Sequence, residues 1–156
     1  KLYQYTAIDE YSRLRFDYGY EEHSTYSSAD FLIRAVKWYK RRGIKIKCVQ
    51  TDNGPEFTTR FIRGLTEKPT LFQTTAAKLG IYHKLIKPYT PRHNGKVERS
   101  HREDHNKFYS CHSFSSCGDL NKQLKVHLAR SNNRPMHPLG WLSPVEFLSF
   151  YRVQNH

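Results

Sequence analysis

A strand–helix–strand order in the middle of the chain constrains the fold more than any other feature. Residues 44–51 form a short stretch with several apolar side chains, and they run straight into the turn-forming segment 52–55 (DNGP). A helical stretch around residues 75–79 and a short strand over residues 81–86 follow. Because a crossover helix makes its two strands parallel, this order predicts an α/β sheet in which the first of these strands ends at Asp52.

The segments before this unit predict two further elements. Residues 2–9 and 15–20 are rich in β-branched and aromatic residues, and the polar stretch between them predicts a β-hairpin. Ser27 followed by Asp30 forms a capping box, which predicts a helix that runs until Gly43. A hairpin and a helix therefore precede the parallel part of the sheet.

A polar helix is predicted to follow the second parallel strand. Residues 87–95 carry two prolines, an asparagine and a glycine, which predicts a loop whose Asn94 can cap a helix beginning near Lys96. From residue 97 to residue 109 only three side chains are apolar. Packing against a core therefore does not explain this helix.

Two later segments have the patterns of structural elements. An i, i+4, i+8 stripe of leucines begins at Leu120, and the segment 143–146 (SPVE) opens a last helix. Trp38 and Trp141 are predicted to be packing residues.

The charge of the chain indicates a polyanionic partner. Its 156 residues fit one domain, and 37% apolar residues can bury a core, so the net charge of +12 belongs to a folded surface. Nucleic acid is favoured over anionic lipid because no basic amphipathic helix stands out. No apolar run approaches the roughly 18 residues of a membrane span. The three cysteines have no tight spacing, so we expect reduced thiols in a soluble, cytoplasmic protein without a membrane partner.

The positive charge is concentrated in two windows, each with one isolated acid. Seven cations and no acid lie between Asp30 and Asp52, and six cations lie with the single acid Glu98 over residues 84–102. Each acid could simply relieve local repulsion. The other interpretation is a metal site in a phosphate-binding surface. Because Asp52 ends a strand and Glu98 begins a helix, the two can converge on one rim of the sheet.

Two carboxylates beside phosphate-binding cations indicate a hard divalent metal. Oxygen ligands in such surroundings favour Mg²⁺ or Mn²⁺. These ions activate a water or a 3′-hydroxyl and stabilise the leaving oxygen of a phosphodiester. That is the chemistry of a nuclease or a transesterase.

Two motifs carry a resemblance to a known family. Residues 49–57 (VQTDNGPEF), followed by residues 88–99 (PYTPRHNGKVER), resemble the catalytic core of Asp-Asp-Glu transposases and retroviral integrases. Residues 7–13 (AIDEYSR) precede them in the order of the family pattern. Residues 139–147 (LGWLSPVEF) are similar to the segment that closes the core in bacterial insertion-sequence transposases.

The resemblance implies a fold, an activity and a ligand set. It implies one integrase-type core over residues 1–156, helices from about residue 118 included, with an α/β, ribonuclease-H-like mixed sheet flanked by helices. It makes Asp52 the second and Glu98 the third metal-binding, catalytic carboxylate, with Mg²⁺ or Mn²⁺ as cofactor. The implied activity is DNA transposition or integration, by in-line attack of water or a 3′-hydroxyl, in a homo-oligomer that holds transposon ends and target DNA. Between the two acids lie 45 residues, more than the roughly 35 of the retroviral pattern, which predicts an insertion over about residues 64–74.

One carboxylate of the family pattern has no counterpart in this sequence. It belongs on a strand before the hairpin, so we expect a truncated core that lacks its first strand. Asp9 is a poor substitute, because it falls late on a strand about 10 Å from the strand of Asp52, where a turn role is expected. The parent protein would then be a polynucleotidyl transferase, whereas this chain alone is expected to show little or no turnover.

Cations around Glu98 are predicted to hold DNA phosphates, with a solvated helix face as the alternative. The predicted DNA-binding residues are Arg92, Lys96, Arg99, Arg102 and His105.

Two other interpretations are open at this point. One is a zinc site of His101, His105, Cys111 and Cys117, although the two cysteines are further apart than in most zinc knuckles. The other is a catalytically incomplete core that only binds DNA or contributes to assembly, for which binding should weaken steeply as salt rises.

Overall fold

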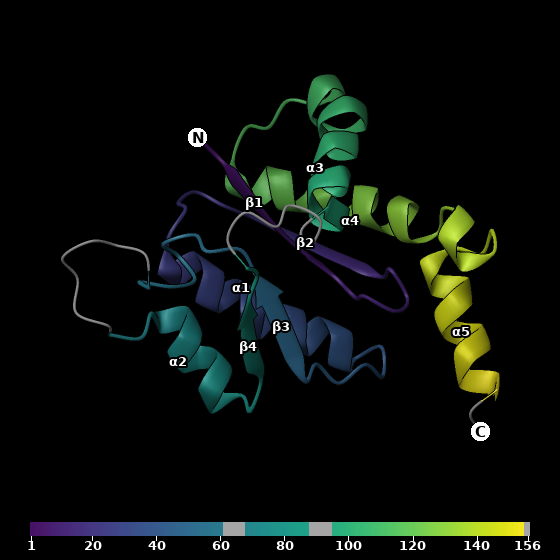
Figure 1. Cartoon of the computed structure of the whole chain (residues 1–156). Helices are drawn as coiled ribbons and strands as arrows, with labels where there is room; N and C mark the ends of the chain where they lie inside the picture. Colours follow the sequence, from purple (N-terminus) through teal and green to yellow (C-terminus); the bar gives the residue numbers. More distant parts are fainter. Residues whose placement is uncertain (61–67, 88–94, 155–156) are drawn as a thin grey trace.

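The computed structural model describes residues 1–60, 68–87 and 95–154, in which strands and helices mix as expected for an α/β fold (Figure 1). Their bounds are β1 Tyr3–Ile8, β2 Arg15–Tyr20, α1 Thr25–Lys40, β3 Cys48–Thr51, α2 Leu71–Lys78, β4 Tyr82–Leu85, α3 Gly95–Lys107, α4 Cys117–Asn132 and α5 Pro144–Gln154. None of the helices in these ranges is long and apolar enough to cross a membrane.

The first two strands form the predicted hairpin. They pair antiparallel in a register that runs from Tyr3 opposite Tyr20 to Ile8 opposite Arg15. Asp9 closes the turn, because its Oδ2 accepts hydrogen bonds from the backbone N–H of Ser12 at 2.8 Å and from its hydroxyl at 2.6 Å. The turn role of Asp9 is confirmed.

Helix α1 begins earlier than the capping-box pattern predicts. Its N-cap is Ser24, whose side chain accepts a hydrogen bond from the backbone N–H of Ser27. The prediction that Ser27 and Asp30 form the cap was wrong, because Ser27 lies buried in the first turn. Asp30 instead accepts a hydrogen bond from the Tyr20 hydroxyl at 2.7 Å and pairs with Arg34.

Strands β3 and β4 are parallel, as predicted. Their register runs from Cys48 opposite Tyr82 to Thr51 opposite Leu85. Strand β3 is shorter than the predicted strand over residues 44–51.

The helix between these strands begins earlier than expected. Thr70 and Gln73 form a capping box at the start of α2, in which each side chain accepts a hydrogen bond from the other residue's backbone N–H. The predicted insertion over residues 64–74 therefore overlaps the first turn of a regular helix. The other part of it, residues 64–67, lies outside the described residues.

Described helices lie on both faces of the β1–β2 pair and on one face of the β3–β4 pair (Figure 1). On one side, Leu32 of α1 and Phe72 and Ala76 of α2 form a buried cluster against which Val49 of β3 packs. On the other side, α3 contacts β1 and α4 contacts β2. The leucine stripe of α4 is buried as predicted, with Leu124 1% exposed.

The described strands form two separate pairs rather than one sheet. Strand β1 pairs with β2 and β3 pairs with β4, and no ladder within the described ranges joins the two pairs. Each of the four strands, β1 and β3 among them, therefore has one edge without a described strand partner.

The two tryptophans differ in their environment. Trp38 packs against Phe16, with ring centroids 5.2 Å apart, as predicted. Trp141 is 68% exposed, so its predicted packing role was wrong. It lies at a positive φ of 65°, two residues before Ser143, which forms a capping box with Glu146 at the start of α5, as predicted for that helix.

Candidate functional site

Asp52 lies directly after β3, in a turn that several contacts fix. Its Oδ1 accepts a hydrogen bond from the backbone N–H of Gly54 at 3.0 Å. The side-chain amide of Asn53 donates to the carbonyl of Ile86 at 3.2 Å, which ties the turn to the end of β4. A Cβ at position 54 would lie 2.6 Å from a carboxylate oxygen of Glu56, so a larger residue there would have to displace the Glu56 side chain. Asp52 is half-buried, and among the described residues its Oδ2 accepts no hydrogen bond.

Glu56 is a buried acid in the same turn, and no sequence pattern marks it as a separate candidate. It is 7% exposed, and its Oε1 lies 2.9 Å from Nε2 of His23. Its Oε2 is buried and has no hydrogen-bond partner within the described part of the chain. The same holds for Oδ1 of Asn53. The available signal was its position inside the motif over residues 49–57.

Glu98 lies in the first turn of α3 and is exposed. Residues that are three to four positions apart share one face of a helix, so Glu98 lies on the same face as Arg102 and His105. Arg99, Arg102 and His105 are all exposed. Of the other predicted DNA-binding residues, Lys96 pairs with Glu10 of the hairpin turn.

Arg92 lies outside the described residues.

A buried ion pair network, rather than an apolar face, holds α3 on the strands. Asp104 of α3 is 1% exposed and pairs with Arg15 of β2. The guanidinium of Arg15 also binds Asp17, with Nε 2.7 Å from Oδ2. Asp104 accepts a second hydrogen bond from the amide of Gln4 at 2.9 Å, and its other oxygen lies 2.9 Å from Nε2 of His127 in α4.

The charges in this network stabilise one another. Burial alone would raise the pKa of Asp104, but the His127 hydrogen bond and the charge and hydrogen bond of Arg15 outweigh it, so the pKa lies below its usual value. Burial acts to lower the pKa of Arg15, and the carboxylates of Asp17 and Asp104 reverse that effect and raise it. Asp104 is therefore a carboxylate at neutral pH and Arg15 a cation.

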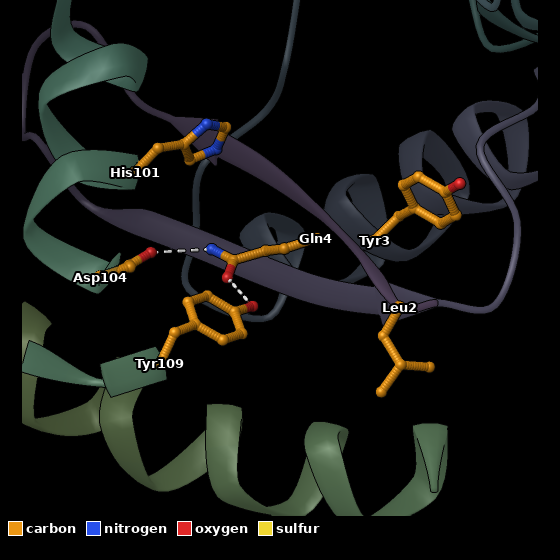
Figure 2. A pocket seen from close by; sticks show the side chains of 6 residues that line it. All are labelled: Leu2, Tyr3, Gln4, His101, Asp104 and Tyr109. Atoms are coloured by element: carbon orange, nitrogen blue, oxygen red, sulfur yellow. Dashed lines mark hydrogen bonds between the residues drawn. The ribbon is translucent and has the colours of Figure 1, made fainter. Parts of the chain in front are cut away.

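A small cavity of about 290 Å³ opens beside this network (Figure 2). Figure 2 shows Gln4 between Asp104 and Tyr109, hydrogen-bonded to both, with His101 on the preceding turn of α3. The imidazole of His101 lies 3.1 Å from the hydroxyl of Thr6 in β1. Partial burial lowers the pKa of His101. These contacts anchor α3 along β1 and leave Glu98 on the outer face.

Asp52 and Glu98 are not joined directly by described contacts. No hydrogen bond or ion pair links them, and no three His, Cys, Asp or Glu side chains in residues 1–60, 68–87 and 95–154 form a metal-binding group. The structure thus places both acids where the sequence predicts, at a strand end and a helix start. Their oxygen donors suit a hard cation such as Mg²⁺.

The zinc interpretation finds no support in the described residues. His101 contacts Thr6, and the thiol of Cys117 donates to the carbonyl of Gly19 at 3.3 Å. Cys111 is an exposed free thiol. The four side chains do not converge on one point.

Comparisons with known proteins agree on one family. Two sequence models, both described as integrase core domain, match residues 1–91 and 79–144. A protein of Spiroplasma virus SpV1-C74 named "Putative integrase ORF3" is 29% identical over 96% of this chain and 42% of its own length. The insertion element IS476 39.2 kDa protein of Xanthomonas euvesicatoria is 29% identical over 70% of this chain and 29% of its own length. The chain thus spans less than half the length of these relatives.

Two solved structures show the same fold. A chain of the simian T-cell lymphotropic virus intasome, solved with PP2A regulatory subunit B56 gamma, superimposes with a TM-score of 0.69 at 20% identity, over 93% of this chain and 47% of that chain. The catalytic core domain of BIV integrase superimposes with a TM-score of 0.64 at 20% identity, over 98% of this chain and 90% of that chain. The fold is therefore that of retroviral integrase cores, which are ribonuclease-H-like.

Proposed function

Because this chain belongs to the integrase core family, we propose that it forms the catalytic core of a protein that cuts and joins DNA. The observation that carries the proposal is the place of the two acids. Asp52 falls inside the match over residues 1–91 and Glu98 inside the match over residues 79–144. Both also lie at the ends of elements, where their carboxylates are accessible. The names of the curated relatives, an integrase and an insertion element protein, agree with this function.

Asp52 and Glu98 would hold Mg²⁺ or Mn²⁺. The accessible oxygens of the two carboxylates are hard ligands, and the Gly54 N–H bond fixes the orientation of Asp52. When bound, such an ion lowers the pKa of an attacking water or 3′-hydroxyl and neutralises the leaving oxygen. Arg99, Arg102 and His105, exposed on α3, would hold phosphates so that the scissile bond is in line with the attacking oxygen.

A third carboxylate would come from a further strand placed between β1 and β3. The two strand pairs support this, since each has an edge without a described partner and neither contributes a third acid to a metal group in the described ranges. Such a strand would join the two pairs into one mixed sheet. Its carboxylate would then lie beside Asp52, because neighbouring strands are about 4.8 Å apart.

The proposed cutting and joining of DNA also implies the partners of the protein. We propose transposon or viral DNA ends and a target DNA as substrates, and a homo-oligomer that brings two ends together. One solved neighbour is itself part of an intasome, which agrees with assembly on DNA.

A nicking and strand-transfer assay with Mg²⁺ or Mn²⁺ tests this function. The chain as it stands should bind DNA with little turnover, and the protein extended upstream in its own reading frame should cut and join labelled DNA. Asp52→Asn and Glu98→Gln should each abolish that turnover, while Asp9→Asn, in the hairpin turn, should leave it intact. Turnover that survives Asp52→Asn, or that depends on Asp9, would contradict the assignment.

A second candidate is a core that binds DNA or supports assembly without catalysis. The lack of a three-acid group among the described residues favours it for this chain taken alone. Salt-sensitive binding by the extended protein, with no cleavage under any divalent metal, would select this candidate.

A further inference from the structure

One face of the β3–β4 pair is not covered by any described helix. Side chains alternate between the two faces along a strand. The face toward α1 and α2 carries Val49, Thr51 and His83. The rings of His83 and Phe72 of α2, for example, have centroids 4.9 Å apart. Figure 1 shows α1 behind these strands. The opposite face carries Cys48, Gln50, Tyr82 and Lys84, and all four are exposed.

This open face leads directly to Asp52. Asp52 directly follows β3, two residues after Gln50, and Lys84 is the register partner of Gln50 on the neighbouring strand. Two residues along a strand span about 6.6 Å and neighbouring strands are about 4.8 Å apart, which places the Cα of Lys84 about 8 Å from that of Asp52. A lysine side chain can therefore reach a phosphate next to the one that a metal ion at Asp52 would bind.

The charge around this face is of one sign. The chain has no acidic residue over residues 31–51 and none over residues 78–87. Lys45 and Lys47, just before β3, and Lys87, just after β4, are exposed. Apart from Asp52, an anion on this face thus meets only cations and neutral groups in the described strands.

The face also carries an aromatic ring. Tyr82 is 68% exposed, although a tyrosine on a strand usually packs against a neighbour. A flat sheet surface with an exposed ring beside lysines is suited to unpaired bases, which stack on aromatic side chains while the backbone follows the positive charge. A duplex does not offer base faces to such a ring.

We propose that the open face of β3–β4, defined by Cys48, Gln50, Tyr82 and Lys84, binds an unpaired DNA strand on its way to Asp52. Lys84 contacts a phosphate and Tyr82 stacks on a base. This inference rests on the proposed function, because it specifies the path and the single-stranded state of the DNA on which the protein is proposed to act. It assigns roles to residues outside the acidic site and outside α3.

Two native cysteines provide the test. Cys48 lies on the face and Cys111 lies after α3, and both are exposed free thiols. A single-stranded DNA oligonucleotide should slow alkylation of Cys48 by N-ethylmaleimide severalfold and leave Cys111 unchanged, as read by mass spectrometry of the peptides. A duplex of the same sequence should protect Cys48 less.

Two variants sharpen the test. Lys84→Glu should lower the slope of log affinity against log salt by about 0.7, the loss of one phosphate contact on a single strand. Tyr82→Leu should weaken single-strand binding by about tenfold, the scale of one base–aromatic stack. Lys125→Glu, at an exposed position of α4, is the charge-matched control and should change neither.

The outcomes separate this inference from the proposed function. DNA binding without selective protection of Cys48, or equal effects of Lys84→Glu and Lys125→Glu, would overturn the inference and leave the proposed function standing. No salt-sensitive DNA binding at all would contradict both. The alkylation experiment uses the unaltered chain, so it tests the inference even if a variant fails to fold.

Discussion

Asp104 is the residue on which the position of α3 depends most. A carboxylate that is 1% exposed costs free energy unless charges and donors compensate for its lost hydration. Arg15, Gln4 and His127 supply that compensation from two strands and a second helix. Removing one partner from such a group leaves a buried charge unpaired, so the network acts as a unit.

Asp104→Asn should destabilise the protein by about 3 kcal/mol at neutral pH, since it leaves Arg15 buried with one carboxylate fewer. The folded-state pKa of Asp104 is lowered, so its contribution is present above the unfolded pKa of about 3.9 and is lost as pH falls through the folded value. Urea unfolding followed by circular dichroism at pH 7 and near pH 3 measures this. The expected difference between wild type and variant is large at pH 7 and shrinks at the acid end. A difference that is the same at both pH values would contradict the assignment.

At this scale the sequence indicated Asp52 and Glu98 but not Asp104 or Glu56. Asp52 and Glu98 stand out because each is the isolated acid of a basic window. Asp104 is one of several charged residues on a polar helix, and its partner Arg15 lies 89 positions away in the sequence. Burial of that kind follows from tertiary pairing, which no local pattern encodes.

At the scale of elements, α4 contributes apolar packing where α3 contributes polar contacts. Leu120 and Leu124 of α4 pack with Phe108, the residue that follows α3, in a buried cluster. Since α3 buries only Ser100 and Asp104 of its own residues, the packing beneath its end depends on α4.

Leu124→Ala should therefore lower the free energy of unfolding by about 2–5 kcal/mol, the cost of removing a fully buried leucine side chain. Val126→Ala is the matched control on the same helix, because Val126 is 54% exposed, and it should change stability by no more than about 0.5 kcal/mol. Chemical denaturation of both variants measures the difference. Equal effects of the two would mean that α4 does not pack as described.

The elements themselves were largely predictable, and their starts were not. The hairpin, the parallel strands and the leucine stripe follow from local periodicity, which packing then reinforces. The start of α1 was misplaced because Ser24 and Ser27, three positions apart, can each cap a helix. In the structure Ser27 is buried in the first turn and Ser24 is the N-cap. The exposed Trp141 shows the same limit, since periodicity does not reveal which large side chain stays at the surface.

At the scale of the whole molecule, the positive charge and the two separate strand pairs both agree with the proposed function. The net charge of +12 suits a polyanion, and the integrase core match agrees with our proposal that this polyanion is DNA. The described strands form two separate pairs, which supports the proposal that a further strand lies between them. The supply of the third carboxylate stays a prediction.

Divalent-metal binding at Asp52 and Glu98 is the central claim, and Mn²⁺ titration of the isotope-labelled chain by NMR tests it most directly. Paramagnetic broadening should appear first at the amides next to the two acids, Gly54 and Val97 among them, and should be lost in Asp52→Asn and in Glu98→Gln. Asp9→Asn, in the hairpin turn, is the control and should keep the broadening. Broadening that persists in Asp52→Asn, or that is centred on the hairpin turn, would contradict the account.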